Sequence, residues 1–146
     1  MIWLLRHGEA EDSADDDAAR RLTAKGEHQA RVAGESLAAL GVRVDACLAS
    51  PKVRALDTAR IVCRELGGEV ETEEALRGGE FDPQKLASGR GDVLMVGHEP
   101  DLSRATHALT GARVDLKKGG LAAIEDGQLI SLLRPDQLEA IAAGPG

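Results

Sequence analysis

Two arginines and two histidines stand out as residues that could do chemistry. Arg6 and His7 come where the apolar run "MIWLL" gives way to "RHGEA", and Arg54 and His98 lie in "SPKVRALDTA" and "VGHEPDLS". Arginine offers phosphate oxygens planar, paired donors and keeps its charge. An imidazole beside such a cation is a poor metal ligand but a good acceptor of a phosphoryl group. These residue types favour a phosphate-handling site over a metal centre.

Hydrophobic patterning predicts the strands that position these residues. Short apolar runs bounded by polar residues are typical of buried strands, and they occur at "MIWLL", "DACLAS", "DVLMVGH" and, more briefly, "GEVETE". The segment "LAAIEDGQLISLL" is two such runs around Asp126–Gly127, which predicts a β-hairpin. Residues 78–91 are rich in glycine and polar side chains, so only one helical turn, after Pro83, is expected there.

Three helices are expected between the strands, and a brief fourth follows Pro135. Thr23 is expected to cap the first, Pro51 and Pro100 to begin the second and third, and glycines to end the first and third. Their expected bounds are about Ala24 to Leu40 with a stop at Gly41, Pro51 to about Leu66, and Pro100 to Gly111. The apolar stripe predicted for the first consists of Ala30, Ala33, Leu37 and Leu40. Strands that alternate with helices indicate a three-layer α/β/α fold with a mostly parallel sheet and an antiparallel edge hairpin.

This architecture predicts that the four candidate residues meet. In open α/β sheets the functional crevice lies outside the carboxyl ends of the strands. The first strand delivers Arg6 and His7 to that edge, the strand "DVLMVGH" delivers His98, and the second helix carries Arg54 on its first turn. The helix starts nearby would add backbone N–H donors for an anion.

Length, charge and composition limit the remaining possibilities. The 146 residues suit a single domain over 1–146, and the formal net charge of −7 and near absence of aromatic residues oppose nucleic-acid binding. Cys47 and Cys63 lack the spacing of a metal site and are expected in the core. Arg6 interrupts the opening apolar run too early for a signal peptide or a membrane span, so no membrane partner and a cytoplasmic location are expected.

Four segments in order, "LLRHGEA", "RLTAKGEHQA", "LASPKVRALDTA" and "VGHEPDLS", resemble the landmarks of the histidine phosphatase superfamily, which has the phosphoglycerate-mutase-like fold. The compact chain and the stretch "LKKGGLA" are most similar to SixA-type phosphohistidine phosphatases. The resemblance implies that His7 is a nucleophile that becomes transiently phosphorylated. It implies that Arg6 and Arg54 clamp the phosphate, that His98 donates to the transferring group, and that water then hydrolyses the phosphoenzyme without a metal or cofactor.

The chain departs from ester-cleaving members of that superfamily at their glutamate general acid. Those members carry the glutamate shortly after a leucine, whereas "ALRGGE" has Gly78 there and Glu80 two residues beyond. An alkoxide leaves poorly unless an acid protonates it, whereas a phosphohistidine can leave as neutral imidazole. The missing acid favours a P–N substrate, and Glu80 is the possible general acid for an ester.

Several other polar residues receive a structural interpretation. Residues 9–17, "EAEDSADDD", are predicted to be a solvated acidic loop, in which Glu9 is a hydrogen-bonding partner and which would repel highly charged small anions. His28 and His107 are read as ordinary helix residues. Ser50 and Thr58 have no base at a recognisable sequence offset, so neither is predicted to be a nucleophile.

The leading hypothesis is a phosphohistidine phosphatase that acts on a phosphorylated protein, such as a phosphotransfer or phosphorelay domain. The short interval between Arg54 and His98 leaves no room for a large insert over the pocket, which favours a protein substrate. One alternative is a small-molecule phosphomonoesterase of the same superfamily. Another is a catalytically inactive phosphate-binding module, although such a module has no need of a nucleophile.

Overall fold

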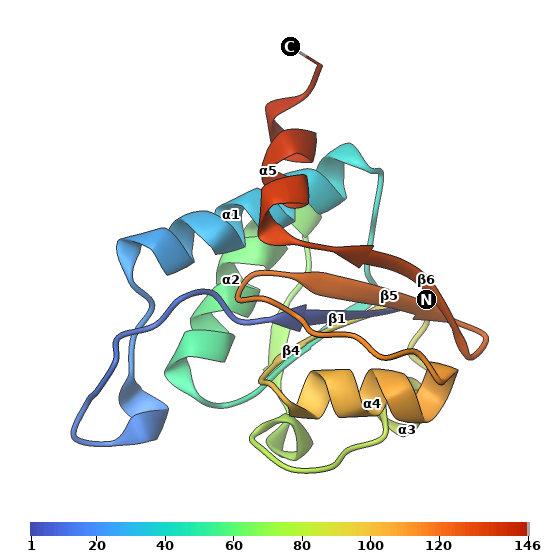
Figure 1. Ribbon diagram of the computed structural model, residues 1–146, viewed down its shortest axis with the longest axis horizontal. Coiled ribbons are helices and arrows are strands. Elements are labelled where there is room, and N and C mark those ends of the chain that lie inside the picture. The colour runs from blue at the N-terminus through green and yellow to red at the C-terminus, as the bar shows by residue number, and fades with distance from the viewer. Residues whose placement is uncertain (146) are drawn as a thin grey trace.

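A mixed six-stranded sheet forms the centre of the structure, a computed structural model that describes residues 1–145 (Figure 1). The strands are β1 (Ile2–Arg6), β2 (Ala46–Ala49), β3 (Val70–Thr72), β4 (Val93–Gly97), β5 (Leu121–Glu125) and β6 (Gln128–Leu133). Their order across the sheet is β3-β2-β4-β1-β5-β6. Strands β1 to β4 pair in parallel, whereas β5 pairs antiparallel with both β1 and β6. The predicted mostly parallel sheet with an antiparallel edge is therefore confirmed.

The turn of the edge hairpin has the backbone that its sequence predicts. Asp126 and Gly127 connect β5 to β6 and have φ angles of 51° and 72°. Two-residue hairpin loops require such positive φ angles because their twist then matches that of the strands. Asp and Gly are among the residues that tolerate this conformation, so the hairpin is specified locally.

Helices cover both faces of the sheet (Figure 1). One layer contains α1 (Ala24–Ala39), α2 (Val53–Leu66) and α5 (Pro135–Ala143), and the other contains α3 (Pro83–Ala87) and α4 (Asp101–Thr110). Short 3-10 helices, η1 (Asp17–Ala19) and η2 (Glu74–Leu76), precede α1 and α3. Successive side chains of a strand point to opposite faces. Trp3 and Leu5 of β1 therefore pack in the core under α1, α2 and α5, whereas Leu4 packs in the core under α3 and α4. This confirms the three-layer arrangement.

The helix termini agree with the sequence prediction except in two places. Thr23 caps α1 by accepting a hydrogen bond from the Gly26 N–H at 3.1 Å, as predicted. Leu40, however, is 52% exposed, because α1 ends at Ala39 and the chain turns away at Gly41.

The second difference lies at the start of α2. The helix begins at Val53, not at Pro51, and Lys52 is its extended N-cap residue. The Ser50 hydroxyl accepts a hydrogen bond from the Lys52 N–H at 3.2 Å, and this contact holds the chain in a turn for two residues after β2. Arg54 still falls on the first turn of the helix.

The predicted core positions of the two cysteines are confirmed, since Cys47 and Cys63 are buried and free. No helix within residues 1–145 is long and apolar enough to cross a membrane.

Candidate active site

Neighbouring strands bring the two histidines together. In the parallel pairing of β1 with β4, Arg6 lies opposite Gly97, so His7 and His98 both leave the sheet at the same end. The His7 N–H donates to the Gly97 oxygen at 3.2 Å, and the two imidazole centroids are 5.2 Å apart. Both side chains are largely buried, at 7% and 8% exposure.

The two predicted arginines lie beside these rings. A cavity of about 270 Å³, called the histidine cavity below, is lined by Arg6, His7, Arg54 and His98. Arg54 is buried although it belongs to the first turn of a helix, because that turn faces the ends of β1 and β4. The structure thus places together the four residues that the sequence picked out, which are up to 92 positions apart in the chain.

A close backbone approach holds the segment after His7. A Cβ on Gly8 would lie 2.4 Å from the Gly26 oxygen, and a Cβ on Gly26 would lie 1.9 Å from the Glu9 oxygen. Real Cβ atoms do not approach so closely, so both positions require glycine. Thr58 adds a link to α2, because its hydroxyl accepts from the Gly8 N–H at 3.1 Å and donates to the Arg54 oxygen at 2.7 Å.

The His7 ring is held as a neutral imidazole with one defined tautomer. Its Nδ1 lies 2.6 Å from the Gly8 carbonyl oxygen, which can only accept, so Nδ1 carries the proton and Nε2 has a free lone pair. Burial lowers the pKa of His7 from 6.5 to about 4, and the charges of Arg54 and Arg6 act in the same direction. The His7 ring is therefore uncharged at neutral pH.

His98 is also buried and neutral. Burial, followed by the neighbouring His7 and Arg54, lowers its pKa from 6.5 to about 3. Its Nε2 lies 2.8 Å from the Ser50 hydroxyl. Sequence offsets did not reveal this serine–histidine pair, but Ser50 is fully buried and out of reach of a substrate. The pair instead fixes the orientation of the His98 ring.

Three buried nitrogen atoms of this cavity have no hydrogen-bond partner. Within the described residues they are the only buried side-chain polar atoms without one: Arg6 Nε, Arg54 Nε and His98 Nδ1. Buried polar groups are nearly always hydrogen-bonded, so each exception calls for an explanation. All three belong to predicted site residues, and an anion in the histidine cavity would supply the acceptors that the two guanidinium nitrogens lack.

A third arginine, Arg20, lines the same cavity and was missed in the sequence. Its Nε is 3.0 Å from the Asp17 carboxylate, and its Nη1 donates to the Glu11 oxygen at 2.8 Å. It lies outside the strand ends, on the loop after η1, so neither hydrophobic periodicity nor strand order pointed to it. The only available signal was the pair of arginines directly after the acidic run in "DDDAARR".

The prediction that segment 9–17 is a solvated acidic loop is wrong for Asp17, because Asp17 binds Arg54 and Arg20. Its backbone oxygen accepts from Arg54 Nη1 at 2.9 Å, and its carboxylate lies 3.3 Å from Arg54 Nη2 and 3.6 Å from Lys52 Nζ. The guanidinium of Arg54 is the main reason that the pKa of the Asp17 carboxyl lies below its usual value. Glu9 has the structural role predicted for it, since its backbone and carboxylate contact Gln29, Thr23 and Lys25.

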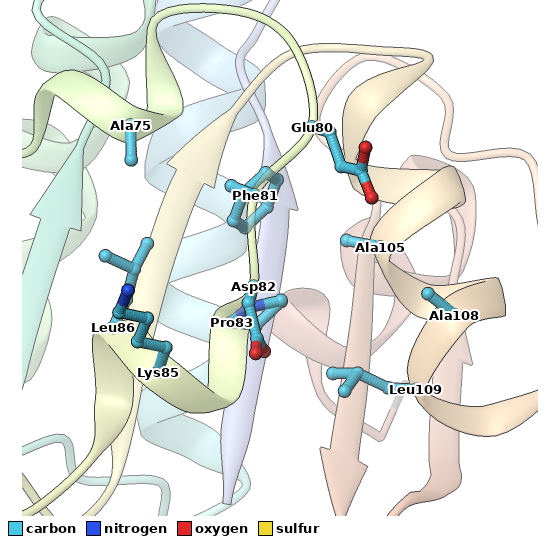
Figure 2. Close-up of a pocket in the computed structure, with 10 residues that line it drawn as sticks. All are labelled: Ala75, Glu80, Phe81, Asp82, Pro83, Lys85, Leu86, Ala105, Ala108 and Leu109. Atoms are coloured by element: carbon cyan, nitrogen blue, oxygen red, sulfur yellow. The ribbon is translucent and has the colours of Figure 1, made fainter.

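Glu80 does not line the histidine cavity. It lies with Phe81 beside a separate cavity of about 600 Å³ between α3 and α4 (Figure 2). The carboxylates that do line the histidine cavity are Asp12 and Glu99. Both Glu99 oxygens accept hydrogen bonds, from the N–H and hydroxyl of Ser103 and from the Leu116 N–H, so this carboxylate serves to hold two segments together.

One of those segments supports Arg6. The Leu116 oxygen accepts a hydrogen bond from Arg6 Nη1 at 2.9 Å, so Glu99 acts on Arg6 through Leu116. Among residues 1–145 no group of three or more His, Cys, Asp or Glu side chains is arranged to hold a metal ion. The metal independence of the chemistry stays a prediction.

Comparison with known proteins places the chain in a family. The model of the histidine phosphatase superfamily (branch 1) matches residues 2–85, more than half of the chain. An uncharacterised protein of Picosynechococcus sp. is 34% identical over 140 residues, covering 86% of this chain and 85% of that one. The mitochondrial serine/threonine-protein phosphatase Pgam5 of Drosophila ananassae is 43% identical over 65 residues, which span 44% of this chain and 22% of Pgam5.

Solved structures share the whole fold. The protein histidine phosphatase SixA, solved with tungstate, superposes with a TM-score of 0.82 at 23% identity, covering 94% of this chain and 98% of SixA. A putative phosphohistidine phosphatase SixA from Agrobacterium tumefaciens superposes with a TM-score of 0.80 at 23% identity, covering 92% of this chain and 97% of that one. The phosphoserine phosphatase of Entamoeba histolytica superposes with a TM-score of 0.69 at 18% identity, covering 94% of this chain and 98% of that one.

The fold and the matched segment define the class of protein. The chain belongs to the histidine phosphatase superfamily. Its architecture is that of the SixA phosphohistidine phosphatases, which confirms the fold expected from the four sequence segments.

Proposed function

We propose that this protein is a phosphohistidine phosphatase that removes the phosphoryl group from a histidine of another protein. The observation that carries the proposal is the set of unpartnered nitrogens, Arg6 Nε, Arg54 Nε and His98 Nδ1, around the neutral ring of His7. The likeness to SixA, itself a protein histidine phosphatase, over nearly the whole chain supports the same substrate class.

The proposed reaction is a two-step displacement at phosphorus. His7 Nε2 attacks the phosphorus while the P–N bond of the substrate breaks, and the substrate imidazole leaves in its neutral form with a proton from solvent. A water molecule then attacks phospho-His7, which releases inorganic phosphate and restores the free Nε2. Phosphoryl transfer is catalysed mainly by positioning and charge stabilisation, and Arg6, Arg54 and Arg20 provide that charge.

The neutral state of His7 is essential to this sequence. A protonated ring has no lone pair on Nε2, whereas the buried ring with its proton on Nδ1 is ready to attack. His98 is proposed to contact the transferring phosphoryl oxygens, because its ring lies beside His7 and is oriented by Ser50.

Initial rates on a phosphohistidine protein and on simple phosphate monoesters test the proposal. We expect fast release from phosphohistidine, slow ester hydrolysis, and loss of more than about a thousandfold in kcat/KM for His7→Ala. Trapping of an acid-labile phosphoenzyme in the unsubstituted protein alone would support the intermediate. Unchanged turnover in His7→Ala would refute the mechanism, and phosphate binding without turnover in the unsubstituted protein would indicate the inactive binding module.

A phosphomonoesterase is the second candidate, because one carboxylate is available in the right cavity. Ester cleavage needs an acid for the leaving oxygen, and Asp12 lines the histidine cavity while its carboxylate accepts no hydrogen bond among residues 1–145. Fast ester turnover that falls in Asp12→Asn would favour this function. Glu80→Gln is the matched comparison, since Glu80 lies beside the other cavity.

A further inference from the structure

A second cavity adjoins the histidine cavity and has a basic lining. Its volume is about 510 Å³, and it shares Arg6 and Lys118 with the histidine cavity. Three further basic side chains complete the surface called the basic groove below: Lys25, Lys117 and Arg134. Only two acidic residues line it, although the whole chain has a net charge of −7. Positive charge is thus concentrated beside the proposed site in an otherwise acidic protein.

The turn before β5, which carries Lys117 and Lys118, is hydrogen-bonded to the end of β1, directly before His7. The Gly119 N–H lies 3.1 Å from the backbone oxygens of both Arg6 and His7, and the Arg6 N–H donates to the Gly120 oxygen at 3.0 Å. Gly119 has a φ of 80°, and a Cβ there would lie 3.0 Å from Gln29 Cβ. These backbone contacts keep the segment before β5 at a constant place relative to the nucleophile.

The basic side chains of the groove are available to a ligand. Lys25, Lys117 and Arg134 pair with Glu9, Asp115 and Asp136 at 3.6, 3.0 and 3.2 Å, but five of these six side chains are more than half exposed. Exposed ion pairs of this kind contribute little and exchange readily. Lys118 makes no ion pair within the part of the chain that the structure describes. A carboxylate that reaches the groove therefore meets charges that are unpaired or only weakly paired.

We propose that the basic groove binds an acidic segment of the phosphorylated partner protein while its phosphohistidine occupies the histidine cavity. The proposal rests on the proposed function. Charge complementarity selects an acidic occupant, and the shared Arg6 places it next to the phosphoryl group. Besides Arg6 at the end of β1, the basic lining comes from α1, from the turn before β5 and from the start of α5. Charges spread over three elements fit several carboxylates on a chain better than one small acid.

Two phosphohistidine peptides that differ only in their flanking residues, acidic in one and neutral in the other, provide the test. We expect the unsubstituted protein to hydrolyse the acidic peptide with the higher kcat/KM, and we expect this preference to weaken with salt. In Lys25→Ala/Lys117→Ala the ratio of the two kcat/KM values falls by about fivefold, the upper range for losing an exposed charge pair. The matched control, Lys85→Ala/Arg104→Ala, removes two positive charges beside the other cavities and leaves the ratio unchanged.

The outcomes separate failure of this inference from failure of the proposed function. Equal kcat/KM for the two peptides, or a preference that survives in the groove variant, would overturn the acidic docking surface while phosphohistidine hydrolysis stands. Phosphoglycolate, a compact phosphate with one carboxylate, is the third substrate. If only the kcat/KM for phosphoglycolate falls in the groove variant, the groove binds a small acid, and the proposal that it binds an acidic segment of a partner protein is refuted. Absence of turnover on every phosphohistidine substrate would refute the proposed function itself.

Discussion

The lowered pKa of His7 leads to a prediction that can be worked out in numbers. With a pKa of about 4, roughly 90% of the rings are neutral at pH 5, whereas an ordinary histidine of pKa 6.5 would be only about 3% neutral there. The nucleophile should therefore remain competent from pH 8 down to about pH 5. The difference between the two cases is about thirtyfold in the reactive form at pH 5.

Nuclear magnetic resonance of the imidazole carbons measures this directly. The chain has four histidines, so the spectrum contains four Cε1 resonances, and His7→Gln identifies the one that belongs to His7. We expect that resonance to shift only below about pH 5. The value of kcat/KM for phosphohistidine, corrected for the ionisation of the substrate, should show its acid limb in the same range because it reports the free enzyme. A His7 resonance that titrates near pH 6.5 would refute the argument from burial.

The same shift predicts a dependence of stability on pH. Because the folded pKa is lower than the unfolded one, the unfolded chain binds the proton more readily, and stability is lost as the pH falls from 6.5 towards 4. For His7 the loss amounts to about 2 kcal/mol at pH 5 and about 3 kcal/mol below pH 4. Urea denaturation should show that His7→Gln reduces the difference in unfolding free energy between pH 7 and pH 5 by about 2 kcal/mol. An equal difference in both proteins would contradict the assignment.

Three further predictions concern the residues around the rings. Asp17→Ala should lower kcat/KM by about tenfold and weaken inhibition by vanadate, because the carboxylate that bridges Arg54 to the neighbouring loop is lost. Gly26→Ala should lower the free energy of unfolding by about 3 kcal/mol or more in urea denaturation, since its Cβ would lie 1.9 Å from a backbone oxygen of the loop after β1. Ser50→Ala should reduce kcat because the His98 ring loses the hydroxyl that orients it, and it should lower the melting temperature moderately because the Lys52 N–H loses its acceptor.

Each of these has a matched comparison. Asp15→Ala removes an equally acidic, exposed residue and should leave vanadate inhibition unchanged; a loss as large as that in Asp17→Ala would mean that only loop charge matters. Gly68→Ala adds a Cβ with no atom within 4 Å, and equal destabilisation by both alanines would argue against the close contact. Ser50→Thr keeps the hydroxyl, so its failure to restore kcat relative to Ser50→Ala would count against orientation of the ring.

The local signals of the sequence predicted most of the scaffold. Apolar runs that stop at Arg6 and Gly97 marked β1 and β4, Thr23 marked the start of α1, and Asp126–Gly127 marked the hairpin. These features depend on residues close in the chain, because side-chain alternation, capping and positive φ angles are local properties. Strand ends at one edge of a parallel sheet then predicted which four residues meet.

Contacts between distant segments hold those four residues in place. Arg6 is supported by the oxygen of Leu116, 110 positions away, and His98 by Ser50, 48 positions away. Asp17 and the lysines before β5 reach the site through loops whose paths follow from packing. Hydrogen bonds between distant segments leave no signal in the sequence comparable to hydrophobic periodicity or helix capping. They form only when the sheet brings those segments side by side. The strands, the helices and the four chemical groups could therefore be predicted from local sequence patterns. Tertiary packing decided the tautomer of His7, the arginine supports and the basic groove.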